Sequence, residues 1–183
     1  AEPGKRVLKV RVGGRERTAT LRVLRRARPP PQVLPRLEVT AERAETLRTN
    51  RAALGPVLKG VSPAALWSGP LRRPTAGRIS EVFGVLRTYG GGAVWPHRGL
   101  DFAIGRGWPV VAAGPGVVAL ARRLDEYGNT VVLDHGQTVF TAYLHLTASQ
   151  AAVGTRVAQG QVIGTVGATG MATGPHLHFA AYV

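Results

Sequence analysis

The strongest constraint on the fold is a series of short β-type segments separated by glycines, which fills the chain from Gly77 onward. Eighteen of the 24 glycines lie in this region, but only four of the 13 prolines. It lacks any periodic segment of helix length. We therefore expect residues 65–183 to form one mainly β domain, a compact antiparallel β-sandwich-like fold. The expected strands are Trp108–Ala112, Gly116–Ala121, Thr130–Leu133, Thr138–Tyr143, Gln161–Val166 and His176–Tyr182.

A β-hairpin is predicted near the N-terminus. Apolar and polar residues alternate on both sides of Gly13-Gly14 over residues 7–24, and a two-residue glycine link between such runs is typical of a hairpin. One hairpin is too small to be stable alone. We interpret residues 1–28 as an accessory segment to the main domain.

Residues 29–64 are predicted to be a proline-rich linker followed by a helix. Pro29–Pro31 and Pro35 favour an extended backbone. A helix is expected over residues 40–54, with Thr40 as its N-cap and Gly55-Pro56 as its end. We place the domain boundary near residue 65.

Charge is concentrated in the first third of the chain. The net charge is +14, and residues 1–60 hold 15 basic and 5 acidic residues. Such a segment indicates an anionic neighbour, and anionic cell-wall polymers are one candidate. Residues 1–66 hold no aromatic residue that could stack on bases, so we do not expect nucleic acid as a partner. We also expect no transmembrane segment, because no apolar run approaches about 20 residues.

Candidate metal ligands lie in two short segments. His97 and Asp101 are separated by Arg98-Gly99-Leu100, and imidazole with carboxylate suits Zn²⁺. In an expected strand, His176 and His178 point to the same face, so one can bind a metal while the other stands beside it. Their spacing alone does not decide which one binds.

His145 is a third candidate, in the expected strand that ends near Leu146. By alternation it shares a face with Thr141 and Tyr143, whereas Ala142, Leu144 and Leu146 take the other face. His135 lies at a turn and is left out of the site. Three ligands with further unliganded imidazoles form the composition of a catalytic zinc site.

Residues 77–183 resemble the zinc metallopeptidases of the M23 family (lysostaphin-type, LytM-like), which cut peptides in bacterial cell walls. The order and approximate spacing of the matching segments are those of the family. These segments are Ser80–Gly84, His97–Asp101, Gly107–Ala113, Gly128–Gly136, Tyr143–Leu146, Gly160–Gly164, Gly167–Gly170 and Gly174–Phe179.

The resemblance implies a role for each histidine of the site. One zinc ion would be bound by His97, Asp101 and His178, while His145 and His176 would be catalytic residues without binding it. The implied activity is that of a secreted or cell-envelope endopeptidase that hydrolyses amide bonds in peptidoglycan stem or cross-bridge peptides. A water activated by the metal would attack the carbonyl, with the two histidines as general base and transition-state stabiliser. The family fold adds a long groove. Residues 90–92 and 168–173 are candidate flexible walls of it, because a glycine-lined wall lets an extended peptide lie close to the backbone, and the alternative is that they are only turns.

The resemblance leaves one alternative open. A non-catalytic relative could bind the cell wall or activate another wall hydrolase, but such a protein usually lacks ligands. Ala180 replaces an acidic residue that is frequent in the family, and this departure removes no ligand.

Overall fold

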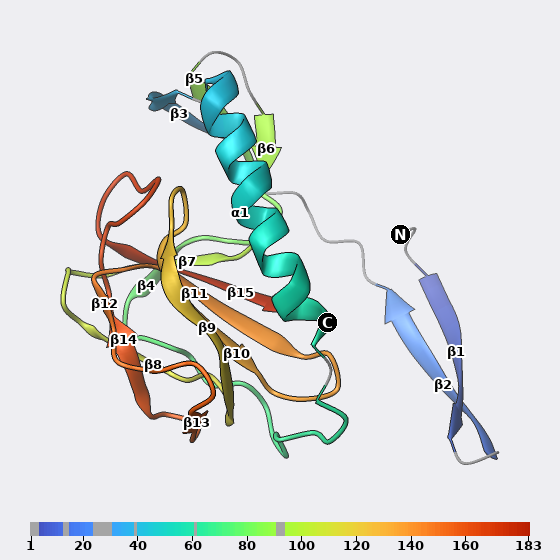
Figure 1. Cartoon of the computed structure of the whole chain (residues 1–183). Helices are drawn as coiled ribbons and strands as arrows, with labels where there is room; N and C mark the ends of the chain where they lie inside the picture. Colours follow the sequence, from blue (N-terminus) through green and yellow to red (C-terminus); the bar gives the residue numbers. More distant parts are fainter. Residues whose placement is uncertain (1–3, 13–14, 24–30, 39, 61, 91–93) are drawn as a thin grey trace.

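An antiparallel sheet of seven strands forms the centre of the fold in this computed structural model, which describes residues 4–12, 15–23, 31–38, 40–60, 62–90 and 94–183 (Figure 1). The strand order is β13-β9-β10-β11-β15-β7-β4, and every neighbouring pair is antiparallel. The strands are β4 (Arg78–Glu81), β7 (Leu100–Ala103), β9 (Gly116–Leu124), β10 (Gly128–Asp134), β11 (Phe140–Leu146), β13 (Arg156–Val157) and β15 (His176–Tyr182).

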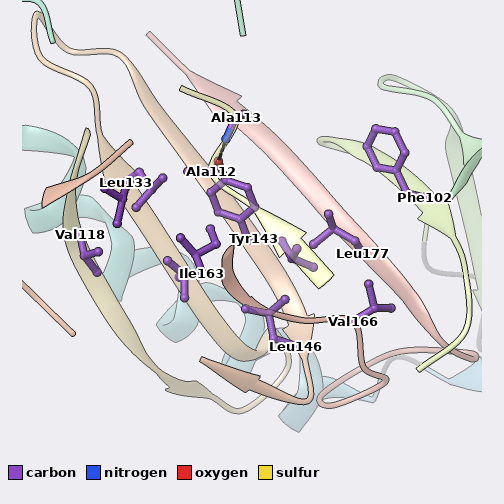
Figure 2. Packing of buried hydrophobic residues seen from close by; sticks show 13 residues of the cluster. Phe102, Ala112, Ala113, Val118, Leu133, Tyr143, Leu146, Ile163, Val166 and Leu177 are labelled. Carbon is purple, nitrogen blue, oxygen red and sulfur yellow. Dashed lines mark hydrogen bonds between the residues drawn. The ribbon is translucent and has the colours of Figure 1, made fainter. Parts of the chain in front are cut away.

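A smaller sheet covers one face of the seven-stranded sheet. Its order is β12 (Ala148–Ser149), β14 (Val162–Thr165) and β8 (Pro109–Val111). Figure 2 shows Ile163 from this sheet packing with Tyr143 and Leu177 of the central sheet, and all three side chains are fully buried. The predicted mainly β, sandwich-like fold is confirmed, and each of the six expected runs overlaps a strand.

The helix α1 (Ala41–Lys59) packs against the opposite face of the central sheet (Figure 1). Thr40 caps it as predicted, because its hydroxyl accepts a hydrogen bond from the Arg43 amide at 3.2 Å. Leu54 is 2% exposed and belongs to a second apolar cluster. The sheet residues of that cluster are Leu120, Leu124, Val132, Phe140, Ala142 and Leu144.

The predicted end of the helix at Gly55-Pro56 is wrong. The helix continues through Pro56 to Lys59. A proline in a helix interior costs about 3 kcal/mol. Leu54 is buried in the second cluster, and Val57 and Leu58 pack against it partly buried, which offsets part of that cost.

The remaining described strands form a hairpin and a third sheet. The hairpin of β1 (Gly4–Val12) and β2 (Arg15–Val23) confirms the predicted pairing, and its Gly13-Gly14 link lies outside the described residues. The third sheet has the order β3 (Gln32–Glu38), β5 (Leu86–Gly90) and β6 (Val94–Pro96).

Strand β3 corrects the prediction of a linker around Pro35. It pairs in parallel with β5, and the pairing is irregular between Leu34 and Glu38. Pro35 lies in that irregular stretch of an edge strand, where its missing N–H breaks no regular pairing. Pro29 and Pro30 lie outside the described residues. Across the described part of the chain, no helix has the length and apolar character that a bilayer crossing requires.

Candidate active site

His97, Asp101 and His178 converge at one point. Asp101 on β7 lies directly opposite His178 on β15, and His97 lies in the turn between β6 and β7. The Asp101 Oδ1 atom is 3.0 Å from His97 Nε2 and 2.8 Å from His178 Nδ1, and the two nitrogens are 3.1 Å apart. A tetrahedral zinc ion with bonds of 2.0–2.2 Å places its ligand atoms about 3.3–3.6 Å apart, so a small outward shift of the three atoms would admit such an ion.

The orientation of His97 suits a metal ligand at this point. Its Nδ1 lies 2.9 Å from the carbonyl oxygen of Val82, which can only accept, so Nδ1 donates there. Nε2 is therefore the nitrogen that faces the carboxylate of Asp101, 3.0 Å from Oδ1. Once deprotonated, Nε2 would offer its lone pair to a metal ion, and the Nδ1 hydrogen bond fixes the ring in that orientation.

Gly99 permits this convergence. A Cβ atom at residue 99 would lie 2.5 Å from the carbonyl oxygen of Phe179 and 2.7 Å from His178 Nε2. Only glycine lets the segment from His97 to Asp101 pass this close to β15, which explains the glycine inside that motif.

Asp101 is held ionised. Burial by itself would raise the pKa of its carboxyl group, but hydrogen bonds with His178 and His97 bring that pKa well below its usual range. Burial also lowers the pKa of His178, despite the opposing effect of Asp101, so its ring is neutral near pH 7. A carboxylate with two neutral imidazoles is a ligand set that zinc prefers.

Arg87 and Glu81 surround this centre, and sequence reasoning assigned neither of them a role. The Arg87 guanidinium contacts both Glu81 and the Oδ2 atom of Asp101, and Glu81 Oε2 lies 3.2 Å from His97 Nδ1. Glu81 belongs to the Ser80–Gly84 segment. No spacing rule connects an arginine on β5 with an aspartate on β7, so nothing in the sequence identified Arg87.

His145 and His176 lie beside the three converging residues. Their ring centroids are 4.8 Å apart, and the His145 ring is 6.1 Å from that of His178. His145 Nδ1 donates to the Thr169 carbonyl at 2.8 Å, and His176 Nδ1 donates to the Gly174 carbonyl at 2.9 Å. In each ring Nε2 is therefore the nitrogen that is left to face the site.

Burial has a large effect on His145. It lowers the pKa of this imidazole to about 3, and the neighbouring rings of His176 and His178 add to the effect. His145 is thus neutral near pH 7 and able to accept a proton or a hydrogen bond through Nε2.

The predicted alternation along β11 is wrong after Leu144. Leu146 packs with Tyr143 in the first apolar cluster, not with Leu144 in the second. The pairing of β10 with β11 is irregular between Asn129 and Val131, and His145 has a φ of +63°. This bulge shifts the alternation by one residue, so that the buried His145 lines the candidate site and not the first apolar cluster.

A pocket of about 250 Å³ opens beside these residues. Met171 and Thr173, from the predicted groove wall at 168–173, contribute to its lining together with Gln32 of β3. Of the other predicted wall, residues 91 and 92 lie outside the described residues. Further lining residues are Ser80, Glu81, Arg87, Asp101, His145 and His176.

His135 is separate from this site, in agreement with its exclusion on the sequence. It is fully buried, with Nδ1 2.7 Å from the Pro115 carbonyl oxygen and Nε2 2.7 Å from the Thr141 hydroxyl. Burial lowers its pKa. Its hydrogen bonds give it a structural place between β10 and β11.

Comparison with known proteins identifies relatives for the part of the chain that holds the site. The sequence profile of peptidase family M23 matches residues 95–183. Peptidoglycan DD-endopeptidase ShyA of Vibrio cholerae is 48% identical over 90 residues, which is 49% of this chain and 21% of the relative. The chain spans about a quarter of the length of the curated relatives that it matches.

Two crystal structures share the fold. A Pseudomonas aeruginosa protein assigned to peptidase M23 matches with a TM-score of 0.73 and 28% identity, over 100% of this chain and 69% of that chain. A zinc-containing peptidase from Vibrio cholerae matches with a TM-score of 0.60 and 38% identity, over 64% of this chain and 37% of that chain.

Proposed function

Residues 95–183 belong to peptidase family M23, and from this match we propose that the chain is a zinc metalloendopeptidase that hydrolyses amide bonds in peptidoglycan stem or cross-bridge peptides. The observation that carries the proposal is the convergence of His97, Asp101 and His178, whose ligand atoms lie within 3.1 Å of one another. A non-catalytic wall-binding protein would not need this set together with His145 and His176.

The proposal assigns His97 Nε2, Asp101 Oδ1 and His178 Nδ1 as the ligand atoms of one zinc ion. When bound, the ion would polarise the scissile carbonyl and lower the pKa of a water molecule to near neutrality. Asp101 reduces the net charge of the site. Arg87 and Val82 hold Asp101 and His97 in the orientation that directs their ligand atoms inward.

His145 and His176 handle protons. Each donates through Nδ1 to a backbone carbonyl, so Nε2 is the nitrogen that each offers to the substrate and the attacking water. One of them takes a proton from the attacking water, and the other, already protonated from solvent, donates a hydrogen bond to the developing oxyanion. The ring that took the proton from water then gives that proton to the leaving amine.

Peptidoglycan as the substrate places the protein in the cell envelope or outside the cell. The curated relative is named as a peptidoglycan DD-endopeptidase. The net charge of +10 in residues 1–60, from 15 basic and 5 acidic residues, suits anionic wall polymers as a second point of contact.

The test is mass analysis of the fragments that the zinc-loaded chain releases from purified peptidoglycan. New pairs of amine and carboxylate ends within the peptides are expected, and Asp101→Asn should abolish them. Release of glycan fragments with intact peptides, or no release by a chain that retains zinc, would contradict the proposal.

A further inference from the structure

His145 occupies a backbone conformation that its own sequence does not favour. Its φ of +63° lies in the left-handed region, which a residue with a Cβ atom rarely adopts. The conformation occurs at the bulge where the pairing of β10 and β11 becomes irregular. Something outside the strand must hold it there, because a strained residue persists only where its surroundings determine it.

Two polar side chains bind the backbone next to His145. The Asn129 amide nitrogen Nδ2 donates to the carbonyls of Leu146 at 3.1 Å and Thr147 at 2.9 Å. The Thr169 hydroxyl donates to the same Leu146 carbonyl at 2.8 Å and accepts from the Asn129 backbone N–H at 2.9 Å. Asn129 and Thr169 are thus bonded to each other and to the segment that follows His145.

Close packing fixes the loop that carries Thr169. A Cβ atom at residue 167 would lie 2.4 Å from the Thr147 nitrogen and 2.6 Å from the His145 carbonyl oxygen. A Cβ atom at residue 128 would lie 2.2 Å from the Thr169 hydroxyl oxygen. Residues 167–170 therefore pack directly against the backbone at 128 and at 145–147, and this close packing fixes the position of the loop.

Thr169 also contacts the imidazole itself. Its carbonyl oxygen accepts the hydrogen bond from His145 Nδ1 at 2.8 Å. The Thr169 hydroxyl anchors the residue, and the Thr169 carbonyl orients the ring. A displacement of Thr169 would therefore move the acceptor that decides which nitrogen of His145 carries the proton.

We propose that Asn129 and Thr169 are positioning residues for His145, which hold the bulge and keep the unprotonated Nε2 of its ring directed at the active site. The catalytic consequence rests on the proposed function. The positioning itself rests on the hydrogen bonds and packing above, so it can be tested apart from activity.

The test uses the zinc-loaded full chain with Thr169→Val, which removes the hydroxyl at nearly constant volume. We expect the ¹⁵N spectrum of His145 to lose the signature of a single Nδ1–H tautomer, with zinc content unchanged. We expect kcat on a peptidoglycan peptide to fall about 10- to 100-fold while KM changes little. Thr169→Ser keeps the hydroxyl and should restore the tautomer signature and kcat. Asn129→Ala should likewise weaken the tautomer signature and lower kcat, and it replaces Thr169→Val as the test if that variant does not fold.

Thr75→Val is the matched control. Thr75 is buried, and its hydroxyl donates to the Pro109 carbonyl at 3.1 Å, away from His145. It should leave the His145 spectrum and kcat unchanged. A wild-type spectrum and wild-type kcat in both Thr169→Val and Asn129→Ala would overturn the proposal. The two proposals can also fail separately. If the wild-type protein is inactive but shows a single His145 tautomer, and Thr169→Val abolishes that signature, only the proposed function is refuted.

Discussion

The imidazole rings of His145 and His176 lie with their centroids 4.8 Å apart on the neighbouring strands β11 and β15. His178, two residues after His176, has Nδ1 2.8 Å from Asp101 Oδ1. The two kinds of histidine are therefore adjacent in space but make different contacts, which allows their roles to be separated by mutation.

His178→Ala should abolish zinc retention, because it removes one of three ligand atoms. His145→Ala should keep the zinc and lose turnover, since His145 lies beside the ligand set without joining it. Zinc content after gel filtration and fragment release from peptidoglycan measure the two effects. Full activity in His145→Ala would show that its assigned role is wrong.

Arg87→Met should weaken zinc binding about 10- to 100-fold, because the guanidinium that holds Asp101 Oδ2 is lost. Arg87→Lys keeps the charge without the planar fork, and should give an intermediate affinity. Competition with a zinc-binding dye gives the affinities. If Arg87→Met binds zinc as tightly as the wild type, the contact has no role in orienting Asp101.

Gly128→Ala should destabilise the fold by about 3 kcal/mol or more, because a left-handed φ of +66° is combined with a Cβ that would lie 2.2 Å from the Thr169 hydroxyl. Gly154→Ala is its control, with a φ of +86° and no atom within 4 Å of the new Cβ. It should cost only about 1–2 kcal/mol, from backbone strain. Urea unfolding measures both, and equal losses would argue against the close packing of residues 128 and 169.

His135 should make stability depend on pH. Burial lowers its pKa in the folded state, whereas the unfolded chain has the ordinary value near 6.5. The unfolded state therefore binds more protons as pH falls below about 6.5, and this contribution to stability, fully present above that pH, is lost on acidification. His135→Gln should show a smaller loss of unfolding free energy between pH 7 and pH 5. Parallel curves for the two proteins would contradict this.

Leu54→Ala should destabilise the whole domain by about 2–5 kcal/mol, because Leu54 is 2% exposed in a cluster with residues of the central sheet. The boundary placed near residue 65 is a prediction that this variant tests. Val33→Ala, at a side chain 66% exposed, provides the control. A negligible effect of Leu54→Ala on the unfolding of residues 65–183 would mean that the helix folds independently.

The sequence was informative wherever a local pattern determines the structure. Gly-Gly between alternating runs predicted the hairpin, Thr40 predicted the helix start, and the run from His176 to Tyr182 coincides with β15. The convergence of His97, Asp101 and His178 was also expected. Their assignment as ligands remains a prediction that the His178 variant tests.

The errors arose where contacts distant in sequence outweigh local preference. The helix passes Pro56 because Leu54 and its neighbours pack on the central sheet. Alternation failed at His145 because Asn129 and Thr169 hold a bulge there, and no spacing within β11 reveals it. Arg87 was missed because its contacts with Glu81 and Asp101 exist only in the folded chain.

The left-handed backbone at His145 has a consequence for protein engineering. Glycine adopts a φ of +63° without the steric cost that a Cβ atom brings. A library selected for heat resistance alone is therefore expected to enrich glycine at position 145, and so to discard the imidazole. Thermostable variants of this chain should be sought only under a selection that also requires hydrolysis.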